Sequence, residues 1–331
     1  MLFGDLMKAL HGILVAASIA LMAPAQAYGQ LSCSPAIGLT TCLPADNLWP
    51  SARGPFTWLA PADTTLPGTV TFGATTSWVY RPIGLTVSSA APGGTTTYPV
   101  EHAVSAHLLA TLGLSSKLSF DVAAPMTLYQ SGAGLGFLTG SPAVLPRSAS
   151  GDLRFGPTLA LVHYRGLDVA GRFAVVAPTG SSDSFATFGS VTFAPGVSAA
   201  YRRARLRLGT DIGARLRKPV QLGDAVIGQQ LSLGLGASYE LIPEAFLTLS
   251  VEAFGLIGLD GQYAVGATSP SKGISQGALV PAEWLVSFAT AHALDGKLGV
   301  RVGMGGAIPT GNASPVTEPA LRSVAAITFT P

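Results

Sequence analysis

Polar and apolar residues alternate through the stretch Arg205 to Lys218, which reads RLRLGTDIGARLRK. The even positions carry large apolar side chains such as Leu206, Leu208 and Leu216, and the odd positions carry every charge before Lys218. A period of two sends alternate side chains to opposite faces of a β-strand, whereas a helix would scatter the arginines among the apolar positions. The stretch is therefore predicted to be a strand with one apolar face and one charged face.

The same alternation recurs along the chain and predicts twelve strands. They span about residues 69–81, 100–112, 117–127, 151–164, 168–178, 190–202, 205–217, 229–241, 245–257, 281–292, 297–308 and 320–330. Most are long enough for a tilted strand to cross a bilayer, which takes about 9–11 residues.

The predicted connections alternate between short and long. The short ones are 113–116, 165–167, 203–204, 242–244 and 293–296, and the long ones are about 82–99, 128–150, 179–189, 218–228, 258–280 and 309–319. Such alternation is typical of an up-and-down barrel with tight periplasmic turns and longer external loops. The predicted fold is all-β, a transmembrane antiparallel β-barrel of about twelve strands in a bacterial outer membrane, with both termini in the periplasm.

The composition explains why the barrel should sit in lipid. Only 11% of the residues are charged, 48% are hydrophobic, and the mean hydropathy is +0.45. A soluble domain carries about 25% charged residues, so too few charges remain to cover a soluble surface. Hydrocarbon offers no hydrogen-bond partner, so the sheet must close. The leucine-rich faces are expected to contact outer-membrane lipid, and the net charge of +2 does not indicate nucleic acid as a partner.

Three segments follow from the pattern. Residues 1–27 are predicted to be a signal peptide with an Ala25-Gln26-Ala27 cleavage site; an uncleaved membrane anchor is the alternative. Residues 28–66, rich in Pro, Ala and Thr, form a predicted N-terminal periplasmic extension, tucked into or under the barrel, and residues 67–331 form the barrel. Secretion machinery and barrel-assembly machinery are the partners expected during biogenesis.

Two cysteines, Cys33 and Cys42, lie in the extension. In an oxidising compartment they can close a small loop, so a Cys33–Cys42 disulfide is predicted. Lipid modification of Cys33 is a weaker alternative, because the residues before it make a poor lipobox.

The polar phase carries charges that are predicted to line the lumen. They are Asp121, Asp152, Arg154, Arg172, Arg205, Arg207, Asp211, Arg215, Arg217, Glu240, Glu252 and Arg301. These charges are compatible with a water-filled pore, in which the basic wall would weakly favour anions, or with salt-bridged side chains that fill a narrow barrel. Glycine and alanine on the same phase leave space, which favours the pore.

Residues that could carry chemistry are sparse. Ser105 and His107 share a strand face, but one such pair is common by chance, so no enzyme is predicted. No metal-ligand spacing or phosphate-binding loop is found, and no cofactor is expected.

Three segments carry a family resemblance: VEHAVSAHLLATLGLSSKLSFDVAAPMTLYQSG from Val100, GDLRFGPTLALVHYRG, and GVSAAYRRARLRLGTDIGARLR. The succession of strands and turns in these segments resembles that of the N-terminal barrel half of large OmpA-family outer-membrane proteins, whose barrels are transporter-like. The resemblance covers about residues 69–331 and implies the fold rather than an activity. It is consistent with passive passage of small solutes through a polar lumen; the alternative is a non-conducting structural or surface-display barrel that acts through its external loops.

Overall fold

The computed structural model describes residues 39–87, 95–136, 144–222, 225–243, 247–259, 280–293, 296–309 and 317–331. Twelve long strands dominate these residues: β1 (Val70–Val87), β2 (Thr95–Gly113), β3 (Leu118–Ser131), β5 (Leu153–Tyr164), β6 (Leu167–Ala177), β7 (Thr192–Arg203), β8 (Leu206–Arg215), β11 (Gln230–Ile242), β12 (Leu247–Gly258), β13 (Ala282–Ala293), β14 (Leu298–Ala307) and β15 (Leu321–Phe329). The short strands are β4 (Ala149–Ser150), β9 (Val220–Leu222) and β10 (Ala225–Ile227).

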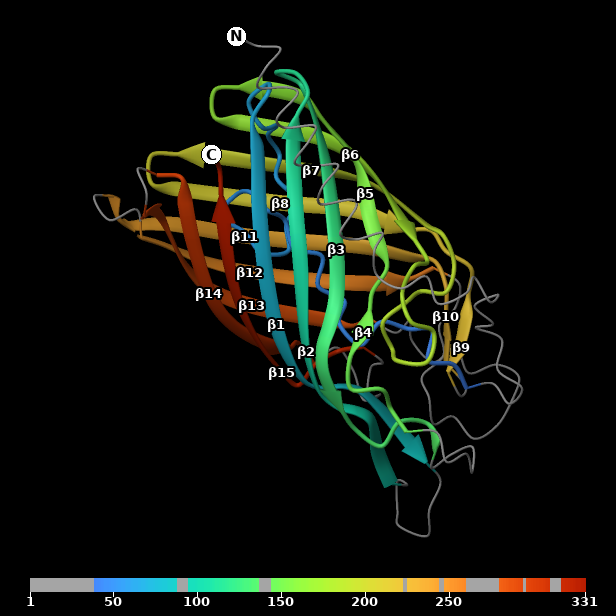
Figure 1. Cartoon of the computed structure of the whole chain (residues 1–331). Coiled ribbons are helices and arrows are strands. Elements are labelled where there is room, and N and C mark those ends of the chain that lie inside the picture. Colours follow the sequence, from blue (N-terminus) through green and yellow to red (C-terminus); the bar gives the residue numbers. More distant parts are fainter. Residues whose placement is uncertain are drawn as a thin grey trace.

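The long strands form one closed antiparallel sheet, which Figure 1 shows as a barrel. Each pairs with its neighbours along the chain, and β15 closes the ring by pairing with β1 from Phe72↔Phe329 to Tyr80↔Leu321. Closure leaves no unpaired strand edge in the wall. The predicted all-β class, the strand number and the up-and-down topology are confirmed.

The two rims of the barrel differ. The connections β2–β3, β5–β6 and β7–β8 are tight turns, and β1 begins and β15 ends at the same rim, where the backbone N–H of Thr330 donates to the carbonyl of Lys297 at 2.9 Å. The longer connections, such as those between β6 and β7 and between β8 and β11, lie at the opposite rim. These rims are called the short-turn end and the long-loop end below.

The first hairpin extends further than its sequence predicts. The alternation predicts a connection over 82–99, but β1 continues to Val87 and β2 begins at Thr95. A register shift between Tyr80 and Ile83, with Arg81 in the left-handed region at a φ of 51°, interrupts the regular period. Beyond this irregularity, the hairpin reaches past the barrel wall at the long-loop end (Figure 1).

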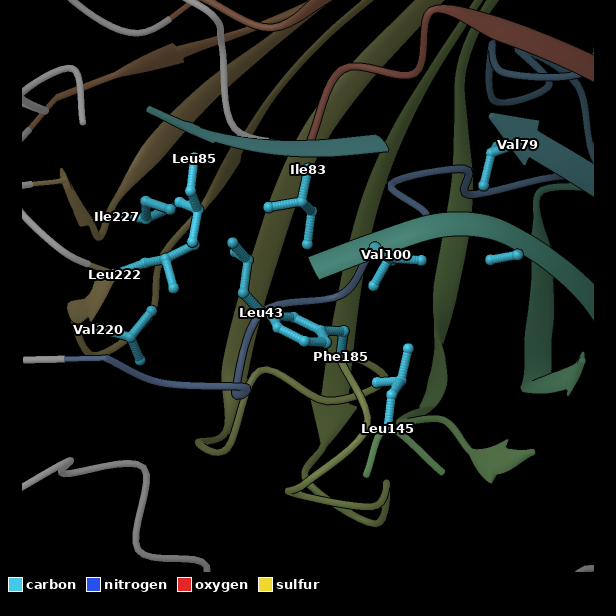
Figure 2. Close-up of a cluster of buried hydrophobic side chains, with 12 residues drawn as sticks. Leu43, Val79, Ile83, Leu85, Val100, Leu145, Phe185, Val220, Leu222 and Ile227 are labelled. Carbon is cyan, nitrogen blue, oxygen red and sulfur yellow. The ribbon is translucent and has the colours of Figure 1, made fainter. Parts of the chain in front are cut away.

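An apolar cluster lies at the long-loop end (Figure 2). Ile83, Leu85 and Val100 of the first hairpin pack there with Leu43 from the N-terminal extension and Phe185 from the β6–β7 connection. Burial of these side chains is a source of free energy that explains why the hairpin continues beyond the wall. The described parts of the loops at this end therefore pack together into a cap.

The two faces of the wall follow the predicted alternation. Outward side chains include Leu235, which is 64% exposed, and Met304, which is 59% exposed, whereas Ser232 and Ser250 point inward and are buried. Exposed apolar side chains on this scale indicate contact with something other than water. Among the described residues, no helix has the length and apolar character of a membrane span.

Candidate functional site

A stretch of irregular structure, residues 45–63, occupies the interior of the barrel and is called the plug below. At its start, the backbone N–H of Ala45 donates to the carbonyl of Phe185 at 2.8 Å, at the long-loop end. Just after it, the hydroxyl of Thr64 donates to the carbonyl of Ser116 at 3.0 Å, in the β2–β3 turn. The plug therefore runs through the lumen from the long-loop end to the short-turn end.

One attachment of the plug is a turn held by β12 and β14. The Glu252 carboxylate accepts hydrogen bonds from the backbone N–H groups of Thr57 at 2.7 Å and Trp58 at 2.8 Å. Arg301 donates to the carbonyls of Phe56 at 2.6 Å and Gly54 at 2.5 Å. Both strands thus satisfy plug backbone groups that no secondary structure pairs, which is what a buried irregular segment requires.

Glycines on the wall make room for the same turn. Gly209 of β8 and Gly236 of β11 are directly paired, and both face the ring of Phe56. A Cβ atom would lie 2.6 Å from a ring atom of Phe56 at Gly209 and 2.8 Å at Gly236, which is closer than real Cβ contacts. Only glycine lets the wall approach the ring this closely.

A second attachment is a buried charged cluster near the start of the plug. Arg322 of β15, which is fully buried, binds Asp46 of the plug at 2.8 Å and Glu283 of β13 at 2.7 Å. The hydroxyl of Ser105 donates to Asp46 at 2.5 Å. Burial alone would raise the pKa of Asp46, but the Arg322 guanidinium, His107 and the Ser105 hydroxyl together hold it well below its usual range. Asp46 is therefore an ionised anchor.

A cavity of about 100 Å³ lies between the plug and the wall. Three guanidinium groups line it, from Arg154 on β5, Arg172 on β6 and Arg215 on β8. The ring of Trp49, on the plug, lies between two of them, 4.8 Å from the Arg154 guanidinium carbon and 4.0 Å from that of Arg215. Cation–π contacts of this kind are worth more when they are desolvated.

Two carboxylates also line the cavity. Asp211 of β8 is paired with Arg172, whose Nε and Nη2 donate to the two carboxylate oxygens. Asp121 of β3 accepts from the hydroxyls of Thr111 at 2.6 Å and Thr158 at 2.7 Å. Three guanidinium groups therefore face two carboxylates, and the cavity carries a net positive charge.

Most of the predicted lumen charges meet at the plug or at this cavity. Eight of the twelve face the interior from strands: Asp121, Arg154, Arg172, Arg207, Asp211, Arg215, Glu252 and Arg301. Asp152 and Arg217 are buried under the long connections, where Asp152 accepts from Thr187 and from the backbone of Phe188.

Arg205 and Glu240 do not line the lumen. β8 begins at Leu206, so Arg205 stands in the tight turn after Ala204, whose φ is 50°. Glu240 lies beside it at the short-turn end, with its backbone N–H bonded to the carbonyl of Arg205 at 3.0 Å. Both side chains are exposed at the rim because the wall ends there.

Sequence reasoning missed Asp46, Trp49 and Arg322. The alternation in β15 could have predicted an inward Arg322, since Arg322, Val324 and Ala326 share one face of the strand, and this face is buried. The two plug residues had no such signal, because the plug has no period.

The pair Ser105 and His107 faces the plug, and both residues are 5% exposed. Acyl chains outside the wall do not reach them. Cys42 is disulfide-bonded, and Cys33 lies outside the described residues, so the predicted pairing stays a prediction. Across the described part of the chain, no three His, Cys, Asp or Glu side chains are grouped to hold a metal ion.

Comparison with solved structures finds a similar fold in one outer-membrane channel. No protein-family model matches the chain, and no curated protein matches it. An outer-membrane channel from Pseudomonas putida F1 superposes with a TM-score of 0.59 at 11% identity, over 82% of this chain and 99% of that one. The KdgM porin gives a TM-score of 0.42 at 7% identity, over 78% of this chain and 98% of the porin. At these identities, the similarity to the Pseudomonas channel is one of fold.

Proposed function

We propose that the protein is an outer-membrane channel for passive passage of small polar solutes, and that the plug is its built-in constriction. The observation that carries this proposal is the inverted arrangement of the barrel, with apolar side chains outside and buried charges inside. A water-soluble barrel of this composition would leave its outer belt of leucine, valine and phenylalanine in contact with water. The fold shared with an outer-membrane channel supports the same proposal.

The described structure corresponds to the closed form of such a channel. The plug contacts the wall at Glu252, Arg301 and Arg322, and the apolar cluster packs at the long-loop end. Solute passage therefore requires part of the plug to leave its wall contacts. The polar contacts of the plug can exchange with water when the segment moves. Leu48, Phe56, Trp58 and Leu59 of the plug also pack in an apolar cluster with Leu285 and Val324 of the wall, and their burial opposes that movement.

Planar-bilayer conductance of purified protein tests the proposal. The full chain is expected to show small or intermittent conductance, and a variant without residues 28–66 is expected to show a larger and steadier one. A variant with the exposed rim substitution Arg205→Ala serves as the control and should behave as the full chain. If both the full chain and the shortened variant stay sealed at high protein load, the channel is rejected.

The rival is a non-conducting structural or surface-display barrel. The cap at the long-loop end favours it, since the first hairpin and the β9–β10 hairpin pack there in one cluster with the buried Phe185. Sealed bilayers with the shortened variant would support this rival. Under either function we infer no chemical conversion, with outer-membrane lipid and the assembly machinery as partners.

A further inference from the structure

We infer that the cavity between the plug and the wall binds a small organic monocarboxylate through the guanidinium groups of Arg154 and Arg215. The inference deepens the proposed channel function, because a site inside the lumen indicates the class of solute that passes. The buried charges around the cavity do not balance, since three guanidinium groups face two carboxylates.

Arg215 is 3% exposed and has no carboxylate within ion-pair distance among the described residues. It donates to the carbonyl of Asn47 at 3.3 Å and to the side-chain oxygen of Asn47 at 3.4 Å. It also lies over the rings of Trp49 and Phe254, at 4.0 Å and 5.7 Å. Asp211 is the carboxylate of the cavity whose charge acts on it, and that carboxylate is already paired with Arg172. A buried cation normally has an anionic partner, because desolvation without one is costly.

Arg154 is in the same position across the cavity. It donates to the carbonyl of Pro50 at 3.0 Å and lies over the ring of Trp49, and it forms no ion pair within the described residues. Its guanidinium group and that of Arg215 both line the cavity. Two incompletely compensated cations that share one cavity are a site for an anion.

The other charges at the cavity fix the valence of that anion. Arg172 is neutralised by Asp211, and Asp121 is a carboxylate held by two threonine hydroxyls. Three guanidinium groups and two carboxylates leave a net charge of one. A monoanion neutralises it, whereas a divalent anion leaves an excess negative charge in a buried space.

The rest of the cavity wall favours an organic ligand. Ala52 and Ala60 from the plug and Ala123 and Ala174 from the wall line it, together with Trp58. A volume of about 100 Å³ corresponds to roughly three waters at about 30 Å³ each, which suits a carboxylate with a short apolar tail. A planar carboxylate also matches the paired donors of a guanidinium group.

Equilibrium binding to the full chain in detergent micelles tests the inference. Propionate, the probe, is titrated at constant ionic strength, and binding is followed by tryptophan fluorescence, since Trp49 lies against both arginines, and by calorimetry. Saturable propionate binding is expected, with inorganic phosphate at least roughly tenfold weaker. Arg154→Gln and Arg215→Gln should each weaken propionate binding by roughly tenfold or more, because each removes a charged hydrogen-bond donor.

The matched control is Arg205→Gln, which removes an exposed arginine at the rim and should leave binding unchanged. Arg154→Lys keeps the charge and should retain part of the affinity, which separates loss of the site from a folding defect. Binding that is absent in the full chain, or unchanged in both glutamine variants, overturns the inference. If the protein conducts but does not bind propionate, the monocarboxylate site is rejected and the channel function stands. If the protein binds propionate but the bilayer stays sealed, the channel function is rejected and the site stands.

Discussion

The carboxylate of Glu252 on β12 accepts a hydrogen bond from the backbone N–H of Trp58 at 2.8 Å. Trp58 is separated from Glu252 by almost two hundred residues, and the bond joins the plug to the wall. The same carboxylate holds the N–H of Thr57 at 2.7 Å and is itself 1% exposed. One wall side chain therefore fixes the position of a plug turn.

Glu252→Ala is expected to lower the free energy of unfolding by about 3 kcal/mol, because it leaves buried N–H groups of the plug without acceptors. Urea unfolding in detergent micelles, followed by tryptophan fluorescence, measures the change. Glu240→Ala, at the exposed rim, should change it by no more than about 0.5 kcal/mol. Equal effects of the two substitutions would contradict the role assigned to Glu252.

Arg322→Met is expected to cost about 3–5 kcal/mol, since it leaves Asp46 and Glu283 as buried carboxylates without their common cation. Adding Asp46→Asn and Glu283→Gln should recover much of that loss, because no buried charge then remains unpaired. The same unfolding assay measures both variants, and a triple variant no more stable than Arg322→Met would refute the cluster energetics.

A bulky residue at Gly209 is expected to displace Phe56 without removing any charge. Gly209→Leu should therefore raise bilayer conductance if the plug constricts the lumen. Gly171→Ala is the control, since its Cβ would meet its nearest neighbour at 3.5 Å, an ordinary contact. If a folded Gly209→Leu protein has unchanged conductance, the plug does not constrict the path of conduction.

Single-tryptophan variants should distinguish the two faces of the wall. A variant that keeps only Trp284, which is 41% exposed, is expected to be quenched strongly by brominated lipid. A variant that keeps only Trp58, which is 7% exposed and inside the barrel, should be quenched weakly. The reverse order would place water outside the wall and exclude a membrane barrel.

The stability should fall as the pH rises through neutrality because of Glu318, in the β14–β15 connection. Burial, with a smaller contribution from Glu283, raises the pKa of Glu318 from 4.5 to about 8. Between these values the folded protein holds a proton that the unfolded chain has lost, so the contribution of Glu318 to stability is greatest below pH about 4.5 and declines up to about 8. Glu318→Gln should remove this decline in unfolding experiments at several pH values, and a wild-type slope in that variant would refute it.

Asp46 contributes a dependence of the opposite sign. Its pKa is held below the ordinary value of 3.8, so its stabilisation is complete above that value and is lost as the pH falls below it. Asp46→Asn should therefore be less stable than the wild type near neutral pH, and the difference should shrink in acid. A difference that stays constant with pH would contradict an ionised Asp46.

The strands could be predicted from the sequence because a period of two is a local signal. In β8 the apolar phase of Leu206 and Leu208 faces outward, and Arg215 and Asp211 face inward, as the alternation predicts. The two strands of the first hairpin were predicted at 69–81 and 100–112, but their extension to Val87 and from Thr95 was not, because Arg81 at a φ of 51° breaks the period before Ile83. The resemblance to OmpA-family proteins stays a prediction.

The sequence predicted the wall residues of the site but not the plug residues that contact them. Its wall charges, such as Arg154 and Glu252, stand on a periodic pattern. Their partners, such as Trp49 and Thr57, stand in a segment with no period, and the contacts join residues about one hundred to two hundred positions apart. The sequence predicted an extension over residues 28–66 tucked into or under the barrel. Distant contacts leave no trace in local composition, so the wall contacts of the plug and the net charge of the cavity could not be derived.

The plug precedes β1, and β1 meets β15 at the seam that completes the ring. β1 and β15 are the two edges of that seam. They can remain unpaired after every other pair of neighbouring strands has formed. A segment already lying against Arg322 of β15 can be enclosed from the side when the edges join, with no chain end drawn lengthwise through a hole. Pairing of β1 with β15 and enclosure of the plug in the lumen would then occur in a single step of biogenesis.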